Sequence, residues 1–135
     1  MKKLTVSMLT IIFFALCIGC KKDDLTPCQR LEGKWKCESW REDGEEELGY
    51  SLSSFRLEIE ELNGSDGDFE WIIVTEDGDA ETITGEYEVN SNCTELEFSS
   101  SGGTTAEMDF EIDGDELALE GNVDGYYLEL KFERD

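Results

Sequence analysis

Cysteines and carboxylates are the residues of this chain that could do chemistry, because the sequence contains no histidine. Without histidine, Ser-His-Asp and Cys-His catalysis are excluded and zinc lacks its commonest ligand. The chain has 34 Asp and Glu residues, and glycoside hydrolysis needs only a pair of carboxylates. Among so many acids such pairs arise by chance. We therefore expect no catalytic residue, no cofactor and no metal centre, and a protein that is not an enzyme.

Three Asp-Gly-Asp tripeptides, at residues 66–68, 77–79 and 113–115, offer oxygen ligands of the kind that calcium prefers. None has the spacing of a full calcium loop that ends in a bidentate Glu. Asp-Gly is also a common hairpin turn. We favour turns over calcium sites at these positions.

Cys20 follows Met1-Lys2-Lys3, an uncharged apolar run from Leu4 to Ile18, and Gly19. A basic start, an apolar stretch and a small residue are the parts of a secretory signal. The layout resembles a bacterial lipoprotein signal peptide, in which the Cys becomes the acylated N-terminus. We predict a helical signal peptide over residues 1–19 and lipidation, for example by palmitate, at Cys20. An ordinary cleaved signal peptide is the alternative.

The segment Lys21-Lys22-Asp23-Asp24 resembles the export signal that follows the lipidated Cys in Bacteroidota lipoproteins. The resemblance implies a lipid anchor in the outer membrane with the protein at the cell surface. Whether the protein faces the surface or the periplasm stays open, because a solvated spacer would have the same composition. We expect residues 20–30 to be a polar tether and residues 31–135 to be the folded domain.

The net charge limits the partners. It is −23 for the whole chain, and it becomes −25 once residues 1–19, which carry Lys2 and Lys3 and no acid, are removed. Nucleic-acid binding needs a basic surface, so we expect no nucleic-acid partner. Anionic headgroups are repelled as well. We expect a monomer that contacts the membrane through the lipid on Cys20.

Apolar residues alternate with acidic ones through most of the chain after residue 33. This period of two predicts antiparallel strands with one packed face and one wet face. Trp35 and Cys37 are expected to point inward, and Trp40 and Tyr127 outward. The connection from Glu42 to Ser54 is expected to be a flexible first loop. The expected strands are residues 34–38, 55–60, 69–73, 83–89, 95–98, 107–112, 116–120 and 126–133.

Short turns separate these runs. Asn-Gly and Asp-Gly supply the positive φ that tight hairpins need. Eight strands in a meander leave two long edges unless the sheet closes. We therefore predict an all-β, eight-stranded antiparallel up-and-down meander that closes into a barrel. The expected turns are Asn63-Gly64, Asp66-Gly67, Asp77-Gly78, residues 90–92, Gly102-Gly103, Asp113-Gly114, and Asn122 with Asp124-Gly125.

The strand order also predicts a disulfide. In such a barrel the start of the first strand lies at the same end as the turn between strands four and five. Cys28 precedes the first strand and Cys93 lies in that turn, whereas Cys37 lies mid-strand on the inward face. We predict a Cys28–Cys93 disulfide and a buried free thiol at Cys37.

The opening Leu31-Glu32-Gly33-Lys34-Trp35, followed by a meander, resembles the lipocalin-like domains of Bacteroidota lipoproteins. The segments 84–89 and 113–117 are similar to that family as well. The resemblance implies a lipocalin-like barrel in which Gly33 allows close backbone packing and Trp35 plugs one end. It also implies a role in binding a small apolar molecule.

The interior of the barrel leaves two interpretations open. Eight strands enclose a space that is either filled by side chains or holds one small ligand. The many large aromatics on the inward face favour a filled interior. The first functional hypothesis is binding of a small hydrophobic or amphipathic ligand. The alternative is a surface interaction module that recognises glycan or protein through its loops and acidic exterior.

Overall fold

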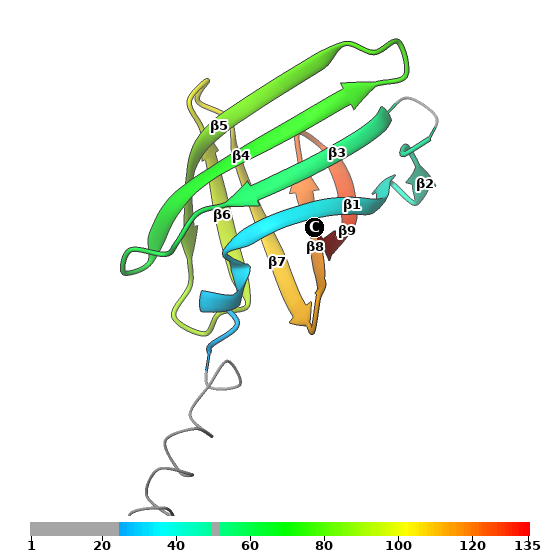
Figure 1. Cartoon of the computed structure of the whole chain (residues 1–135). Coiled ribbons are helices and arrows are strands. Elements are labelled where there is room, and N and C mark those ends of the chain that lie inside the picture. Colours follow the sequence, from blue (N-terminus) through cyan, green and yellow to red (C-terminus); the bar gives the residue numbers. More distant parts are fainter. Residues whose placement is uncertain (1–24, 50–51) are drawn as a thin grey trace, which may run out of the picture.

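The computed structural model describes residues 25–49 and 52–135, which form antiparallel strands around one core (Figure 1). The predicted signal peptide, Cys20 and the segment 21–24 lie outside the described residues. A short 3₁₀ helix, Gln29–Leu31, precedes the first strand. The strands are β1 (Gly33–Glu42), β2 (Glu45–Glu46), β3 (Leu52–Ile59), β4 (Asp66–Thr75), β5 (Ala80–Val89), β6 (Glu95–Ser100), β7 (Thr105–Asp113), β8 (Glu116–Val123) and β9 (Tyr126–Arg134).

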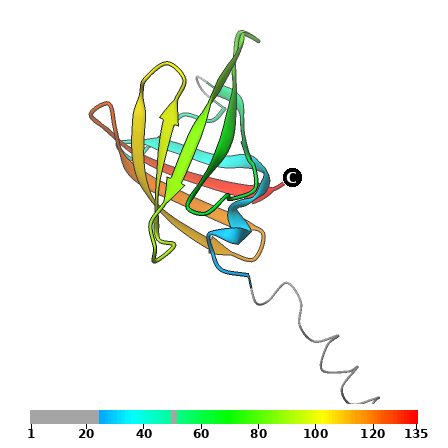
Figure 2. The ribbon, with the colours of Figure 1, turned by 90° about the vertical axis from the view of Figure 1, so that its left-hand side faces the viewer.

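The sheet closes on itself, as the sequence predicted. Its order is β2-β1-β3-β4-β5-β6-β7-β8-β9, and β1 also pairs with β9. The closing register places Trp35 opposite Arg134 and Glu42 opposite Leu128. The eight strands other than β2 therefore form a closed antiparallel barrel. Figure 2 shows the strands curving around one axis, with the segment before β1 at one end.

The core is an uninterrupted set of apolar side chains from the inward face of every barrel strand. Among the described residues no polar or charged residue is buried. The largest fully buried side chains are Trp35, Tyr87, Phe55 and Phe132. The alternation of apolar and acidic residues therefore sorts the chain into a dry inside and an acidic outside.

The connection after β1 contains a strand that the sequence did not reveal. The two residues of β2 pair with Arg41 and Glu42 at the end of β1. Leu48 and Leu52 then form an isolated bridge. Part of the expected flexible loop is therefore built into the sheet, and β3 begins at Leu52 rather than at Phe55.

One expected turn is wrong, and the last one is shorter than expected because Asn122 still belongs to β8. Asp66 and Gly67 belong to β4, and Asn63-Gly64 forms the turn, with the Asn63 N–H donating to the Asp66 carbonyl at 2.7 Å. Gly67 is needed for close packing instead. A Cβ at this position would lie 2.7 Å from Cε1 of Tyr87, which is shorter than van der Waals contact. The Asp-Gly pattern predicted a positive φ at Gly67, but the contact with the Tyr87 ring is the reason that this position requires glycine.

Within the described ranges, 25–49 and 52–135, no helix is long and apolar enough to cross a membrane.

Candidate functional site

The two ends of the barrel differ. The closed end holds the 3₁₀ helix Gln29–Leu31 and Trp35, and we call the opposite end the mouth. At the mouth a cavity encloses about 630 Å³. Small-molecule sites typically enclose about 300–1,000 Å³. The mouth cavity is bordered by the last residues of β1, β4, β6 and β8 and by the first residues of β5, β7 and β9.

Aromatic rings form the inner wall of the mouth cavity. Trp40, Phe69, Trp71 and Phe98 all line it. The ring centroids of Trp71 and Phe98 are 5.1 Å apart, and those of Phe69 and Phe98 are 4.8 Å apart. Phe55 lies behind them, 4.8 Å from Trp40 and 5.3 Å from Trp71. These edge-to-face contacts fix the rings against one another, so the wall is preformed.

Trp40 was expected to point outward, and that prediction is wrong. Its side chain is only 8% exposed. The register of β1 with β9 shifts between Cys37 and Ser39, which is the signature of a β-bulge. One extra residue reverses the side-chain alternation, so Trp40 turns inward. The Trp40 Nε1–H then donates to Oε1 of Glu42 at 3.3 Å at the edge of the cavity.

Glu46 of β2 supports this bulge. Its Oε1 accepts the backbone N–H of Trp40 at 2.8 Å, and its Oε2 accepts the Ser39 hydroxyl at 2.7 Å. Burial opposes ionisation of Glu46, but these hydrogen bonds, one from the Leu48 N–H and the charge of Arg41 lower the pKa of its carboxyl. The carboxylate therefore occupies a hydrogen-bonded position that orients Trp40.

Trp71 has the one polar side-chain atom of the described residues that is buried without a hydrogen-bond partner, its Nε1. Indole can only donate, and an unmatched buried donor typically costs about 1–3 kcal/mol. The core beside the mouth cavity therefore contains a buried indole N–H without an acceptor, whereas the indole N–H of Trp35 at the closed end is hydrogen-bonded.

The rim of the mouth cavity is polar and acidic. Glu42, Glu81 and Asp124 line it, together with hydroxyls that include Thr82 and Ser101. Among the described residues around this cavity none is Lys or Arg. The arrangement combines an apolar wall with a negatively charged rim.

The cavity also opens through the barrel wall. β5 pairs with β6 only from Gly85 to Val89, so residues 80–83 have no strand partner on that side within the described sheet. One hydrogen bond, from the Ser101 N–H to the Thr84 carbonyl at 2.9 Å, ends the pairing. At the last paired position β5 and β6 lie close together, which Gly85 permits because it has no side chain. A Cβ on Gly85 would overlap the carbonyl oxygen of Ser99.

The closed end is sealed by Trp35. Its ring is fully buried and its Nε1–H donates to the Leu31 carbonyl at 2.8 Å. The guanidinium of Arg134 lies 4.1 Å from the centroid of the Trp35 ring. Arg134 also donates to the carbonyls of Glu32 and Arg30, both at 2.9 Å. The sequence did not single out Arg134, although it is the last of the few basic residues in an acidic chain.

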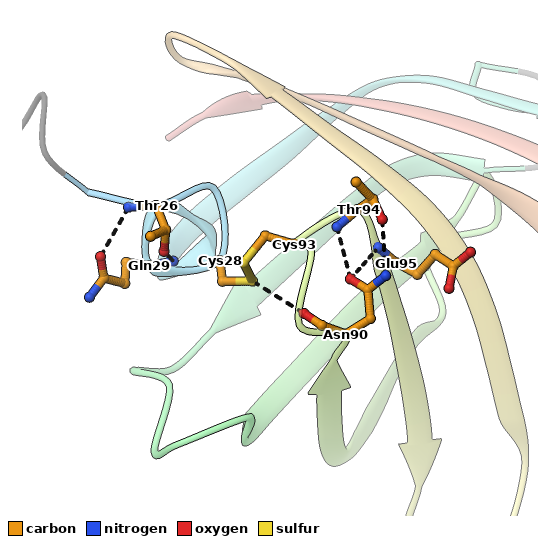
Figure 3. The surroundings of a disulfide bond; sticks show 7 residues. All are labelled: Thr26, Cys28, Gln29, Asn90, Cys93, Thr94 and Glu95. Carbon is orange, nitrogen blue, oxygen red and sulfur yellow. Dashed lines mark hydrogen bonds between the residues drawn. A yellow bond between two sulfur atoms is a disulfide. The ribbon is translucent and has the colours of Figure 1, made fainter.

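The disulfide joins Cys28 and Cys93, the pair that the strand order predicted, with Cα atoms 5.2 Å apart (Figure 3). It ties the segment before β1 to the turn between β5 and β6. In that turn the Asn90 side chain accepts hydrogen bonds from the N–H groups of Thr94 and Glu95. Cys37 is a buried free cysteine.

None of the residues singled out from the sequence, Cys28, Cys93, Gly33 and Trp35, lines the mouth cavity. All four lie at or near the closed end. Gly33 has a φ of +138° and faces the Arg134 guanidinium. These four residues therefore stabilise the barrel, whereas the cavity wall combines rings that alternation placed in the core, such as Phe69 and Phe98, with Trp40, which alternation placed outside.

A second hollow of about 950 Å³ crosses the outer face of β1, β3, β4, β5 and β6. We call it the outer groove. Its lining includes Glu58, Glu60, Asp68 and Glu86, and Lys34 forms an ion pair with Glu58 at 3.2 Å. The outer groove is the larger hollow, but it consists mainly of solvated carboxylates and hydroxyls. The smaller mouth cavity has the apolar wall that small-molecule sites need.

The Asp-Gly-Asp tripeptides form no shared metal site. Over the described part of the chain, no group of three or more His, Cys, Asp or Glu residues is placed to hold a metal ion. Gly78 and Gly114 have positive φ and lie in the turns after β4 and β7, whereas Gly67 lies within β4.

The profile of a family described as the lipocalin-like domain matches residues 31–119, which is more than half of the chain. The chain therefore belongs to the lipocalin-like domain family. No curated protein matches it.

Several solved barrels share the fold. A de novo designed fluorescence-activating β barrel is 20% identical with a TM-score of 0.60, over 82% of this chain and 100% of its own. A redesigned β barrel bound to DFHBI is 17% identical with a TM-score of 0.60, over 78% of this chain and 100% of its own. Lobster apocrustacyanin A1 is 16% identical with a TM-score of 0.51, over 77% of this chain and 60% of its own. At these identities the likeness shows the fold alone.

Proposed function

We propose that this protein is a lipid-anchored lipoprotein of the cell envelope whose barrel binds a small hydrophobic or amphipathic molecule in the mouth cavity. The observation that carries the proposal is the aromatic wall formed by Trp40, Phe69, Trp71 and Phe98 around about 630 Å³. A redesigned barrel of similar fold is bound to DFHBI, which supports the capacity of this architecture to hold a ligand. The protein acts by binding rather than by catalysis.

The anchor is proposed from the N-terminal sequence pattern, in which Gly19-Cys20 follows an apolar run. Thr26 and Cys28 lie at the closed end, where Arg30 N–H donates to the Thr26 carbonyl and Cys28 is bridged to Cys93. A lipid on Cys20 would hold the closed end near the outer membrane. The mouth cavity would then open away from the bilayer, toward the medium or the periplasm.

A neutral probe tests the binding function. We expect naphthylmethanol to bind the full chain at one site in isothermal titration calorimetry. Ala106 lies inside the mouth cavity and is buried, so Ala106→Phe fills the space and should weaken binding at least about tenfold, or about 1.4 kcal/mol. Ala118→Phe places the same ring on the exposed outer face of β8 and should leave affinity unchanged.

Overpacking can cost about 1–3 kcal/mol of stability, so circular dichroism must show that Ala106→Phe is folded. Val123→Phe, at the partly exposed rim, blocks the same cavity with less risk to folding. Equal affinity in wild type and in both blocking variants would contradict the proposal, as would the absence of binding to the wild type.

Two exposed rings at the start of β9 favour a second candidate function, a surface module that recognises glycan or protein. Tyr126 and Tyr127 are 53% and 38% exposed, and aromatic rings of this kind stack on sugars. A glycan array with the full chain tests this candidate. Binding that survives Ala106→Phe but is lost in Tyr127→Ala would support it over the cavity.

A further inference from the structure

We infer that the mouth cavity selects an organic cation, a molecule with an aromatic or alkyl body and an ammonium group. The inference rests on the proposed binding function and specifies the class of ligand. Two features at the same site carry it: the charge of the rim and the chemistry of the wall.

The described residues of the rim include three carboxylates and no Lys or Arg. Glu42, Glu81 and Asp124 line the cavity, and Glu42 is fixed by the hydrogen bond from Trp40. Arg41, the neighbouring base on β1, is 55% exposed and forms an ion pair with Glu46 at 3.6 Å outside the cavity lining. The rim therefore keeps its negative potential, and the net charge of −23 adds to it.

The wall suits a cation for a separate reason. The faces of Trp, Tyr and Phe rings attract ammonium groups through their quadrupole, and indole attracts them most strongly. Two indoles, Trp40 and Trp71, and two phenyl rings line the same space. A cationic ligand can therefore exchange part of its hydration for ring faces while its charge stays close to the rim carboxylates.

The charges of the rim disfavour an anionic amphiphile. A fatty-acid carboxylate in this cavity would lie among carboxylates, with no Lys or Arg among the described lining residues to pair with it. Burying an unpaired charge is costly, and like charges raise the cost. The shape of the cavity admits such a molecule, but the electrostatics of the rim oppose its binding.

Three probes with one naphthyl body separate these effects: naphthylmethanol, naphthylmethyl-trimethylammonium and naphthylmethanesulfonate. We expect the full chain, in calorimetry at low salt, to bind the ammonium about tenfold more tightly than the alcohol and the sulfonate at least tenfold more weakly. Raising the salt to about 0.5 M should reduce the difference, because screening shortens the range of the rim charges. Equal binding of all three probes, or tighter binding of the sulfonate, would overturn the inference while leaving the binding function intact. Absence of binding by all three would overturn the binding function as well.

The rim residues are tested by a charge-neutral triple variant, Glu42→Gln, Glu81→Gln and Asp124→Asn. Gln at 42 retains an acceptor for Trp40, and Asn tolerates the φ of +51° at position 124. We expect this variant to lose most of the preference for the ammonium while its affinity for the alcohol is retained.

A matched control removes the same charge from exposed outer positions and should keep the preference for the ammonium. It carries Glu88→Gln, Glu97→Gln and Glu107→Gln. An equal loss in both variants would assign selectivity to net charge rather than to the rim and would overturn the inference.

Discussion

Arg134 links the last strand of the barrel to the segment before the first. Its guanidinium stacks on the Trp35 ring and donates to two backbone carbonyls, those of Arg30 and Glu32. A cation over an indole contributes about 0.5–2 kcal/mol, and the carbonyls would otherwise lack these donors. The Arg134 side chain therefore connects the ring of Trp35, the segment before β1 and the last strand of the closed sheet.

Cys37 makes the stability of the protein sensitive to alkaline pH. Burial raises the pKa of its thiol from 9.0 to about 12, and the thiol donates to the Ser39 carbonyl. Between these two values the unfolded chain loses a proton that the folded chain keeps. Stability therefore falls as pH rises above 9, by up to about 1.4 kcal/mol per pH unit.

We expect Cys37→Ala to flatten this slope, as measured by urea unfolding from pH 8 to 11. At pH 8 the variant should be slightly less stable because a small cavity replaces the sulfur. Burial also raises the pKa of Tyr87 to about 12, so a residual slope should remain in the variant above pH 10. Parallel stability curves for the two proteins would show that the thiol does not ionise on unfolding.

Alternation predicted most of the core residues, but it failed for Trp40, which is buried, and for Tyr126, which is exposed. The failure at Trp40 has a physical cause, because the bulge depends on how β1 pairs with β9 and on Glu46, which accepts the Trp40 N–H. The β9 partner of Trp40, Leu130, is distant in the sequence, and Glu46 lies in a strand that no apolar alternation marks. Arg134 escaped notice for the same reason, since its contact with Trp35 joins residues about a hundred positions apart.

At the scale of elements, strand order was predictable and strand length was not. Strand order follows once each strand pairs with the next one in the sequence. That order alone brings Cys28 to the same end of the barrel as Cys93. The mouth cavity depends on where pairing stops. The pairing of β5 with β6 ends at Gly85, whereas the pairing of β5 with β4 extends to Ala80 and Val74. The cavity lies where these two pairings differ in length. The acidic pair Glu45–Glu46 also lacks any apolar alternation that would have predicted β2.

The disulfide should contribute substantially to stability. It joins cysteines 65 residues apart, and closing a loop of that length restricts the unfolded chain by about 4 kcal/mol. We expect the double variant Cys28→Ser and Cys93→Ser to remain folded, because the ladder between β1 and β9 closes the barrel independently. Its midpoint in urea should fall markedly, while its affinity for naphthylmethanol at the opposite end should persist.

The control for this experiment is wild-type protein treated with a reductant, which should show the same loss of stability. A double variant as stable as the oxidised protein would contradict the expected contribution of the bridge. Loss of probe binding in a folded double variant would show that the two ends of the barrel are coupled.

At the scale of the whole molecule, the two ends of the barrel have different roles. Trp35, Arg134 and the disulfide close the end where the described chain begins, and the aromatic cavity lies at the other end. The segment from Cys20 to Leu25 can span at most about 18 Å. A lipid on Cys20 would therefore place the closed end within about 2 nm of the bilayer and direct the mouth away from it. The acidic exterior adds no attraction to anionic headgroups, so the lipid is the whole of the proposed attachment.

The role of Cys20 can be tested by acylation and fractionation together. In cells fed a clickable palmitate analogue, we expect the full chain to carry the label and to sediment with membranes. Cys20→Ser should lose the label and appear as a soluble protein that still binds naphthylmethanol, because the cavity is far from the tether.

The matched control is Cys17→Ser, a change within the predicted signal peptide, which should keep both the label and the membrane attachment. Two or more acyl chains make attachment stable, so loss of the acyl chains should release the protein. A Cys20→Ser protein that remained labelled and membrane-bound would show that another residue or segment provides the anchor.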